Sequence, residues 1–309
     1  MLHLLLVIFT FFELNCENLF DVQHDAGKQD EEFLPASSHH WTPYRYWRKL
    51  QGIGQDIAAC GEVAGGLLPD MGILTEVEND SVMRDLTRRS ILRTARYEYV
   101  MTSSPDARGI DVAFLYSPFS FRLLTHHSIR IPPLRGFSPT RDILYAAGLL
   151  ADGDTLHVFG IHAPSRAGGK TESDSYRKHV ASQLALAVDS VERVSHEALI
   201  IIAGDFNDLS GDASLKLLER KGLVEVSRHA RGMHGAKGTY RYQGSWGSLD
   251  HIFCSPRLAR RLKRCSVSDA PFLLEEDKKY GGVKPHRTFL GPVYVGGISD
   301  HLPIVAGFE

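Results

Sequence analysis

The segment LIIIAGDFND at residues 199–208 ends in residues that could do chemistry. Its apolar run leads through Gly204 to Asp205 and Asn207. Side chains alternate along a strand, so these two residues lie on the same side if the extended chain persists that far. The alternative is a strand that runs out into a polar turn, because Gly, Asp and Asn are ordinary turn residues. The segment alone favours neither a site nor a turn.

Polar residues also follow apolar runs elsewhere in the chain. Taken singly, each is explained as a solvated turn, an exposed strand residue or a histidine satisfied by its neighbours. Their recurrence favours a shared site, because binding and catalytic residues gather where strands end. The segments are ELNCEN (13–18), ILTEVEN (73–79), FGIHAPS (159–165), SLDHIFCS (248–255) and GGISDHLPI (296–304).

These residue types suit phosphate chemistry with a hard cation. Carboxylate and amide oxygens suit Mg²⁺ or Mn²⁺, which keep several waters and bind through one or two carboxylates plus a substrate phosphate. A histidine held by an acid suits proton transfer or stabilisation of transition-state charge near neutral pH. Zinc is disfavoured, since no His or Cys spacing matches its sites. Together the types predict cleavage of a phosphoester by water, with the cation polarising a phosphoryl oxygen.

The composition narrows the class of partner. The chain has 309 residues, a formal charge of -2 and a sequence pI near 6.7. This charge gives no basic field, so tight non-specific binding to nucleic acid is not implied, although a balanced total can still contain a local basic patch. The four cysteines have no metal or disulfide spacing, so we expect reduced packing residues.

The apolar run MLHLLLVIFTFF (1–12) predicts a buried first strand. Unlike a secretory signal, it has no Lys or Arg before the apolar stretch and no small-residue cleavage site after it. It is also too short to span a bilayer, and no other segment resembles a membrane span. We therefore expect a cytoplasmic protein without a membrane span.

Hydrophobic periodicity predicts many strands with a few helices between them. The clearest helix, 171–194, has an apolar stripe behind a Thr/Ser start. Without a linker-like change in composition, we predict one domain over residues 1–309, with two packed sheets and helices outside. Further helices are expected at 44–61, 80–92 and 212–222, and further strands at 70–77, 97–102, 110–117, 121–131, 142–151, 154–164, 198–206, 249–255 and 301–308.

Together the motifs resemble the endonuclease/exonuclease/phosphatase superfamily, and in particular a bacterial subgroup of it. That superfamily contains pancreatic-type deoxyribonucleases, apurinic endonucleases, inositol-polyphosphate phosphatases and sphingomyelinases. The resemblance covers almost the entire chain, and the combination of GDFN with a terminal SDH is specific. It implies an α+β fold, the deoxyribonuclease I-like four-layer α/β/β/α sandwich of two mixed β-sheets. The motifs occur in family order: LNCENLFD (14–21), LTEVEN (74–79), RGIDVAFLY (108–116), GIHAPSRAGG (160–169), AGDFND (203–208), LDHIFCS (249–255) and SDHLPI (299–304).

The resemblance also implies a metal site for Mg²⁺ or Mn²⁺. Glu76 matches the main metal ligand of the family. Three other residues match positions that assist it: Asn15, Glu17 and Asp300.

Further roles follow from the resemblance, residue by residue. Asp205 would align or deprotonate the attacking water, and Asn207 would donate a hydrogen bond to the phosphate. His301 would contact the scissile phosphate, with its tautomer and orientation held by Asp250. His162 matches a second histidine that some members use on the phosphate or the leaving group.

Two more residues are expected to bind substrate. Arg141 matches a phosphate-gripping arginine of the nuclease branch, and its alternative is a surface charge. Ser165 follows His162 in the same motif. The chain departs from the pattern at Cys16, where a larger apolar residue is commoner, and at His251, where some nucleases have arginine.

Aromatic residues between positions 21 and 48 have two explanations. They could form a wall over the site, or they could attach the loop and the following helix to the core, which is the preferred explanation. The residues are Trp41, Tyr44, Tyr46 and Trp47.

The leading hypothesis is a divalent-metal-dependent phosphoesterase that cleaves a phosphodiester or phosphomonoester by in-line attack of water. Nuclease and small-molecule or lipid phosphatase activities both remain open. Duplex DNA as substrate would require a cluster of Lys and Arg around the mouth of the site. A catalytically inactive binding module on the same fold is the alternative of another class, and it predicts a missing ligand or histidine. We expect a phosphate-ester substrate, nucleic acid included, and a monomer with no protein partner.

Overall fold

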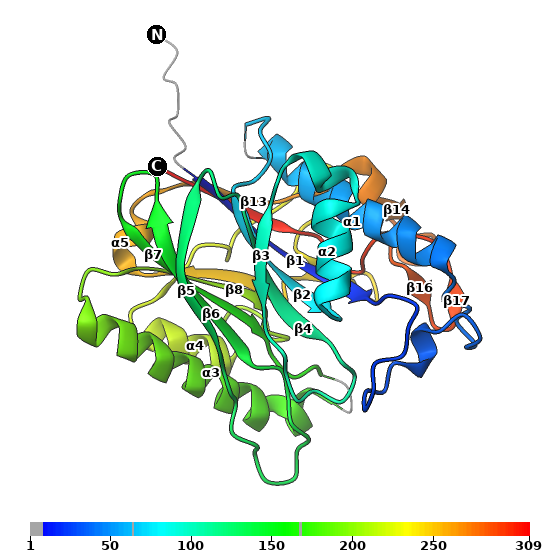
Figure 1. The fold of residues 1–309 in the computed structure, drawn as a ribbon, viewed down its shortest axis with the longest axis horizontal. Coiled ribbons are helices and arrows are strands. Elements are labelled where there is room, and N and C mark those ends of the chain that lie inside the picture. Colours follow the sequence, from blue (N-terminus) through cyan, green and yellow to red (C-terminus); the bar gives the residue numbers. More distant parts are fainter. Residues whose placement is uncertain (1–8, 64, 167–168) are drawn as a thin grey trace.

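The computed structural model describes residues 9–63, 65–166 and 169–309. Two six-stranded sheets lie face to face, and helices cover the outer face of each (Figure 1). This arrangement confirms the predicted four-layer sandwich of two mixed sheets. The part of the predicted first strand before Phe9 lies outside the described residues.

The first sheet places strands from opposite ends of the described chain side by side. Its strands are β1 (Phe9–Leu19), β2 (Met71–Val77), β3 (Glu98–Met101), β4 (Asp111–Tyr116), β13 (Leu262–Val267) and β18 (Ile304–Phe308). They follow the order β13–β18–β1–β2–β4–β3. The pair β1 and β2 is parallel, and the other neighbours in this sheet are antiparallel.

The second sheet has the same mixture of pairings. Its strands are β5 (Phe121–Ile129), β6 (Ile143–Leu150), β7 (Thr155–His162), β8 (Leu199–Asp205), β9 (Val224–Glu225) and β12 (Asp250–Cys254). They follow the order β5–β6–β7–β8–β12–β9. Here β7 and β8 form the parallel pair. Each sheet therefore has a parallel pair whose two carboxyl ends meet at one edge.

Short elements join the long ones. Three two-stranded ribbons lie between residues 240 and 294: β10 (Tyr240–Tyr242) with β11 (Ser245–Gly247), β14 (Leu274–Glu276) with β15 (Val283–Pro285), and β16 (Phe289–Leu290) with β17 (Val293–Tyr294). The chain also forms 3₁₀ turns at Glu31–Phe33, Ile91–Thr94 and Pro271–Leu273.

Helices close both outer faces. The first sheet is covered by α1 (Pro43–Val63) and α2 (Asp80–Arg88), and the second by α3 (Lys170–Val194) and α4 (Ala213–Arg220). A fifth, short helix is α5 (Pro256–Ala259). The side chain of Asn79 accepts a hydrogen bond from the Val82 amide at 3.1 Å and so caps the start of α2.

Three apolar layers hold the sandwich together. Phe9 and Phe11 of β1 belong to the core between the sheets, whereas Phe12 and Leu14 belong to the core under α1 and α2. Because β1 is buried on both faces, its sequence is a nearly continuous apolar run rather than an alternating one. A third core packs α3 and α4 on the second sheet.

Most of the predicted elements are present, with differences at some of their ends. The predicted helix 80–92 ends at Arg88, and a 3₁₀ turn follows because the Ser90 hydroxyl accepts a hydrogen bond from the Leu92 amide at 3.0 Å. Strands β9 and β13, the short helix α5 and the three ribbons were not predicted, since they are short or carry little apolar periodicity. Cys16, Cys60 and Cys254 are buried and Cys265 is half-buried, all as free thiols.

Replacing Gly204 tests the closeness of β7 and β8. Its φ is 149°, and an added Cβ would lie 1.8 Å from the Ile161 carbonyl oxygen. We expect Gly204→Ala to lower the free energy of unfolding by roughly 2–4 kcal/mol, measured from urea denaturation.

The matched control is Gly136→Ala, at a glycine with φ of 88° and no atom within 4 Å of an added Cβ. It carries the left-handed backbone cost alone, about 1–2 kcal/mol. Equal losses in the two variants would show that the contact with Ile161 carries no cost.

Candidate active site

A pocket of about 390 Å³ lies where β1, β2 and β8 end. Its wall combines most of the predicted site residues, from segments far apart in the sequence. Asp250 lies behind His301 rather than on the wall. The predicted residues on the wall are Asn15, Glu17, Glu76, Ser165, Asp205, Asn207, Asp300 and His301.

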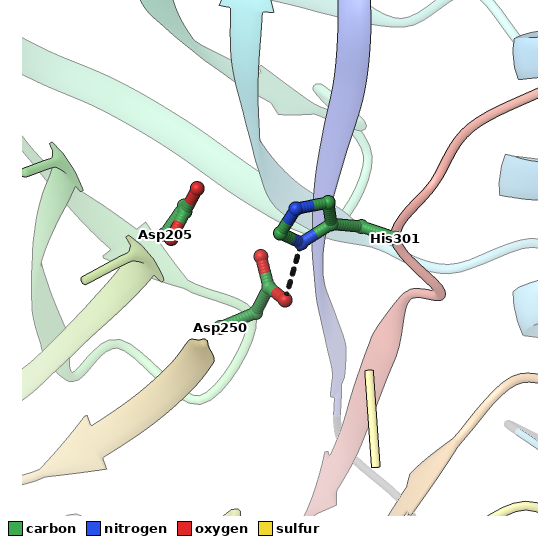
Figure 2. Close-up of side chains that lie close together, drawn as sticks. All are labelled: Asp205, Asp250 and His301. Carbon is green, nitrogen blue, oxygen red and sulfur yellow. Dashed lines mark hydrogen bonds and ion pairs between the residues drawn. The ribbon is translucent and has the colours of Figure 1, made fainter. Parts of the chain in front are cut away.

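His301 and Asp250 form a buried pair at this pocket. Nδ1 of His301 lies 2.7 Å from Oδ2 of Asp250. The dashed line in Figure 2 marks this contact. The hydroxyl of Thr239 donates to the same carboxylate oxygen. Burial lowers the pKa of His301, but the nearby carboxylates, led by Asp250, outweigh burial and raise that pKa well above its usual value. The imidazole is therefore a cation that a carboxylate holds in a fixed orientation.

Asp205, the last residue of β8, is held by two amide groups. The Asn15 side-chain amide donates to Oδ2 at 3.0 Å, and the Asn207 backbone N–H donates to Oδ1 at 2.8 Å. Burial and the negative charge of Asp250 raise the pKa of Asp205 to about 7. A carboxylate with a pKa near neutrality is suited to accept a proton from water.

Asn207 lies in a turn and not in extended chain. Strand β8 ends at Asp205, and Asn207 has a φ of 51°. The condition for the alternation argument, an extended chain through residue 207, is therefore not met. The Asn207 side-chain amide donates to the Ala163 carbonyl at 3.1 Å and approaches the Asp205 carboxylate at 3.2 Å. The segment is thus both a polar turn and part of the pocket wall.

Left-handed backbone conformations gather at this pocket. The register between β1 and β2 also shifts here, and such bulges re-aim side chains. With regular alternation, Glu76 would lie on the helix side of the sheet with Leu74.

A left-handed backbone conformation in a non-glycine residue costs about 1–3 kcal/mol and persists only where the surrounding structure imposes it. The non-glycine wall residues with positive φ are Glu17 (46°), Asn18 (59°), Glu76 (60°) and Asn207 (51°).

His162 lies next to two carboxylates but outside the pocket wall. Its Nε2 is 3.7 Å from Oε1 of Glu76 and 3.7 Å from Oδ2 of Asp205. Burial, and then the charge of Arg141, lower the pKa of His162 well below its usual value. The imidazole is therefore neutral, so these two contacts are not ion pairs despite the short separations.

Glu17 and Asp300 share one guanidinium. Arg287 lies 3.4 Å from Glu17 Oε1 and 3.0 Å from Asp300 Oδ2. The Thr288 N–H donates to Glu17 Oε2 at 2.6 Å, and the Lys49 ammonium donates to the Glu17 backbone carbonyl at 2.6 Å. Both predicted metal-assisting carboxylates thus already have a cationic partner.

The donor set at the pocket fits a hard divalent cation. The wall presents carboxylate and amide oxygens, and Glu76 accepts one hydrogen bond, from the Asn18 N–H at 2.9 Å. Among the described residues, the tight group of possible ligand atoms is a different one, with Asp205, Asp250 and His301 within 4.8 Å of one another. Its closest contact is the His301–Asp250 hydrogen bond, which already uses Nδ1. The Nδ1 atom of His301 is therefore occupied by Asp250 and is not free to bind a cation in this arrangement.

Arg141 is neither a surface charge nor part of the pocket wall. It is buried, forms an ion pair with Asp106 at 3.0 Å, and donates to the Ala163 carbonyl at 2.7 Å. Asn207 donates to the same carbonyl, so Arg141 helps to fix the backbone on which that residue rests. Its predicted contact with phosphate stays a prediction.

The loop before α1 attaches to the core and also reaches the pocket. Trp41 is fully buried and donates to the Phe20 carbonyl at 3.0 Å, and Tyr46 is buried against Asp85. Trp47 packs against the same core, and none of these three lines the pocket, as the preferred explanation expects. Tyr44 is 73% exposed and also absent from the pocket wall, so it fits neither explanation. Other residues of the loop do line the pocket, namely Glu32, Phe33 and His39.

The comparison with protein families agrees with this geometry. The sequence profile described as Endonuclease/Exonuclease/phosphatase family matches residues 10–309. The chain belongs to this family. Members of the family are hydrolytic phosphoesterases and generally depend on a divalent metal. A comparison with curated proteins found no match.

Solved structures of the family share the fold over nearly the whole chain. A mannosyl-6-phosphatase of Bacteroides thetaiotaomicron is 18% identical, with a TM-score of 0.62 and coverage of 96% of this chain and 98% of that one. Truncated TDP2 of Caenorhabditis elegans is 15% identical, with a TM-score of 0.59 and coverage of 97% of both chains. The human Nocturnin catalytic domain with bound sulfate is 14% identical, with a TM-score of 0.57 and coverage of 97% and 94%. At these identities the likeness concerns the fold.

No helix among the described residues of this family member combines the length and apolar character that crossing a membrane requires.

Several residues at or near this pocket were not predicted, and three of them carry charge or an aromatic ring next to the predicted residues. Arg287 and Tyr240 line the pocket, but they lie in segments without a strand-end pattern. Glu13 precedes Asn15 by two residues in β1, so it lies on the same face of the strand. This face also carries Phe9 and Phe11 and points toward the second sheet. Glu13 is fully buried, and its carboxyl oxygens have no hydrogen-bond partner among the described residues. An acid within a nearly continuous apolar run was the available signal.

Glu13 makes the stability of the metal-free protein depend on pH. Burial, with the negative charges of Asp250 and Asp205 and against the positive charge of His301, raises the pKa of Glu13 well above its usual value. Between the unfolded and folded pKa values only the folded state keeps the proton, so stability falls as pH rises. Glu13→Gln removes this term. We expect its advantage over wild type to grow from pH 4.5 to pH 8, by at most about 1.4 kcal/mol per pH unit.

Thermal unfolding in EDTA measures the difference, with the exposed Glu197→Gln as control. An advantage of Glu13→Gln that is the same at both pH values would contradict the assignment of a protonated Glu13.

Proposed function

We propose that the protein is a divalent-metal-dependent phosphoesterase that hydrolyses small phosphorylated substrates by in-line attack of water. The observation that carries the proposal is the meeting of Glu76, Asp205 and His301 in one pocket. Family membership supports the reaction class. An inactive binding module is disfavoured, because the chain retains each of these residues.

Asp205 is the residue suited to receive the proton of the attacking water. Its carboxylate is fixed by Asn15 and Asn207, so it does not rotate away as the water approaches. With a pKa of about 7, it can take a proton at physiological pH without holding one permanently. We assign the Asn207 side-chain amide, which lines the pocket, to a hydrogen bond with a phosphate oxygen, for which it would exchange its 3.2 Å contact with Asp205.

His301 supplies a fixed positive charge. Asp250 occupies Nδ1, so Nε2 remains to contact the phosphate. A positive charge there would stabilise the negative charge that develops on the phosphate as the bond breaks. The imidazole needs no reorientation in the reaction, since Asp250 is itself held by Thr239. His162, neutral and adjacent to Glu76 and Asp205, keeps those carboxylates apart.

A hard cation, Mg²⁺ or Mn²⁺, would be held by Glu76 with Asn15, and by Glu17 and Asp300 through their free lone pairs. When bound, it supplies polarisation of a phosphoryl oxygen and neutralises part of the acidic wall.

The charge of the wall favours a small substrate over a long nucleic acid. Five carboxylates line the pocket, from Glu17, Glu32, Glu76, Asp205 and Asp300. Among the described wall residues, Arg287 is the one Lys or Arg, and it is paired with two of those carboxylates. A duplex would need several phosphate contacts at the mouth of the site. We infer that one phosphate group is recognised.

Removing the central groups should abolish hydrolysis. We expect Mg²⁺-dependent release of nitrophenol from p-nitrophenyl phosphate or bis-p-nitrophenyl phosphate. His301→Ala should lower kcat by roughly 10²–10⁴-fold, the usual contribution of such a group. Glu76→Ala should remove the dependence on Mg²⁺. The control is His196→Ala, at an exposed residue after α3. Wild-type rates in His301→Ala and Glu76→Ala would reject the assigned roles.

Salt dependence tests the size of the substrate. If at most one phosphate of duplex DNA contacts a cationic side chain, its inhibition constant changes by no more than about fourfold between 50 and 200 mM salt. A loss of about 10³-fold or more over this range, together with plasmid cleavage, would instead establish a nuclease with multiple phosphate contacts.

A further inference from the structure

A second groove opens directly from the catalytic pocket. It has a volume of about 640 Å³ and shares Ser165, Asn207, Tyr240 and Leu249 with the pocket. A group in this groove therefore lies beside the residue that we assign to the phosphate, Asn207. The Tyr240 ring also lies 4.9 Å from the His301 imidazole, centroid to centroid, so the groove begins next to the catalytic histidine.

Aromatic and aliphatic side chains form much of the remaining lining of this groove, together with Arg166, Ser245 and Gly247. The ribbon β10–β11 contributes Tyr242 and Trp246, and Leu209 faces them from the segment after β8. Tyr242 is 62% exposed and Leu209 38% exposed, so apolar surface is open to a ligand here. Adjacent exposed apolar side chains of this kind mark ligand-binding grooves.

Trp246 is held in place before any ligand binds. The Arg241 guanidinium lies 5.6 Å from the centroid of the Trp246 ring. Arg241 is fixed in turn by the carbonyls of Gly281 and Val283 and by Asp277. A ring that is already ordered loses little conformational freedom on binding, which favours stacking of a flat partner.

The groove has little to offer a charged group. Its one Lys or Arg among the described lining residues, Arg166, donates to the Asn207 carbonyl at 2.6 Å and pairs with Asp212 at 3.0 Å. That side chain thus secures the turn at Asn207. A second phosphate would lose water in this groove without gaining a cationic partner that is not already paired.

We propose that this groove binds a planar aromatic ring carried by the phosphorylated substrate, such as an aryl group or a nucleobase, stacked on Trp246 and Tyr242. The inference deepens the proposed function and rests on it, because the ring is covalently attached to the phosphate that the pocket binds. The substrate class is then a phosphate ester with one aromatic ring next to the phosphate.

Phosphonates test the groove without turnover, since their P–C bond is not hydrolysed. Calorimetry with the Mg²⁺-loaded protein would compare benzylphosphonate, cyclohexylmethylphosphonate and ethylphosphonate. We expect benzylphosphonate to bind about tenfold more tightly than the other two, and Trp246→Ala to remove this preference while changing ethylphosphonate affinity less than twofold. The affinity of thymidine 5′-phosphonate is compared with that of a ribose 5-phosphonate, which lacks the base. Tighter binding of the thymidine compound identifies the ring as a nucleobase, and equal binding identifies it as an aryl group.

Trp246 also packs against the core between the sheets, so Tyr242→Ser provides a second variant at a more exposed position. The control is Phe119→Ala, at an aromatic residue that is 76% exposed and lies in the turn between β4 and β5. Equal affinity for benzyl- and ethylphosphonate overturns the groove and leaves the phosphoesterase in place. Equal gains for benzyl- and cyclohexylmethylphosphonate, or tightest binding of a pyranose 6-phosphonate, overturn the aromatic class. Failure of every phosphonate to bind overturns the proposed function itself.

Discussion

The hydrogen bond from Asn15 to Asp205 joins the two sheets at the level of the pocket. Its partners are 190 residues apart in the chain and belong to facing strands. Facing sheets stand about 10 Å apart because of the side chains packed between them. The apolar core between β1 and β8 therefore sets the separation that the Asn15 amide and the Asp205 carboxylate must bridge to form their hydrogen bond. The pocket residues contributed by the two sheets, Asn15 and Glu76 from one and Asp205 from the other, all take their positions from this one separation.

Much of the fold, and part of the site, could be predicted from the sequence. Strong apolar runs such as 199–203 predicted strands, and polar residues at their ends predicted the pocket. Strands and helices could be distinguished from the spacing of their apolar residues, because each sheet packs against a core on both of its faces and each long helix packs against a core on one side. The order of motifs then indicated which polar residues belong together.

The remaining features depend on tertiary structure. The orientation of Glu76 follows from a positive φ, which its neighbours impose and which no local pattern reveals. Arg287 acquires its place from two carboxylates contributed by distant segments. Arg141 has the sequence context of a charge near phosphate, yet its buried partner Asp106 turns it toward the Ala163 carbonyl. The short ribbons have too few residues to show a period of two.

The position of β18 couples activity to the completion of folding. This strand pairs with both β1 and β13, so almost the entire described chain forms the loop between two adjacent strands. Contacts of such high sequence separation form slowly and late. His301 lies just before β18, so a partly folded form in which β18 is detached has no imidazole at Asp250. Completion of the pocket therefore requires the most distant strand pairing among the described residues.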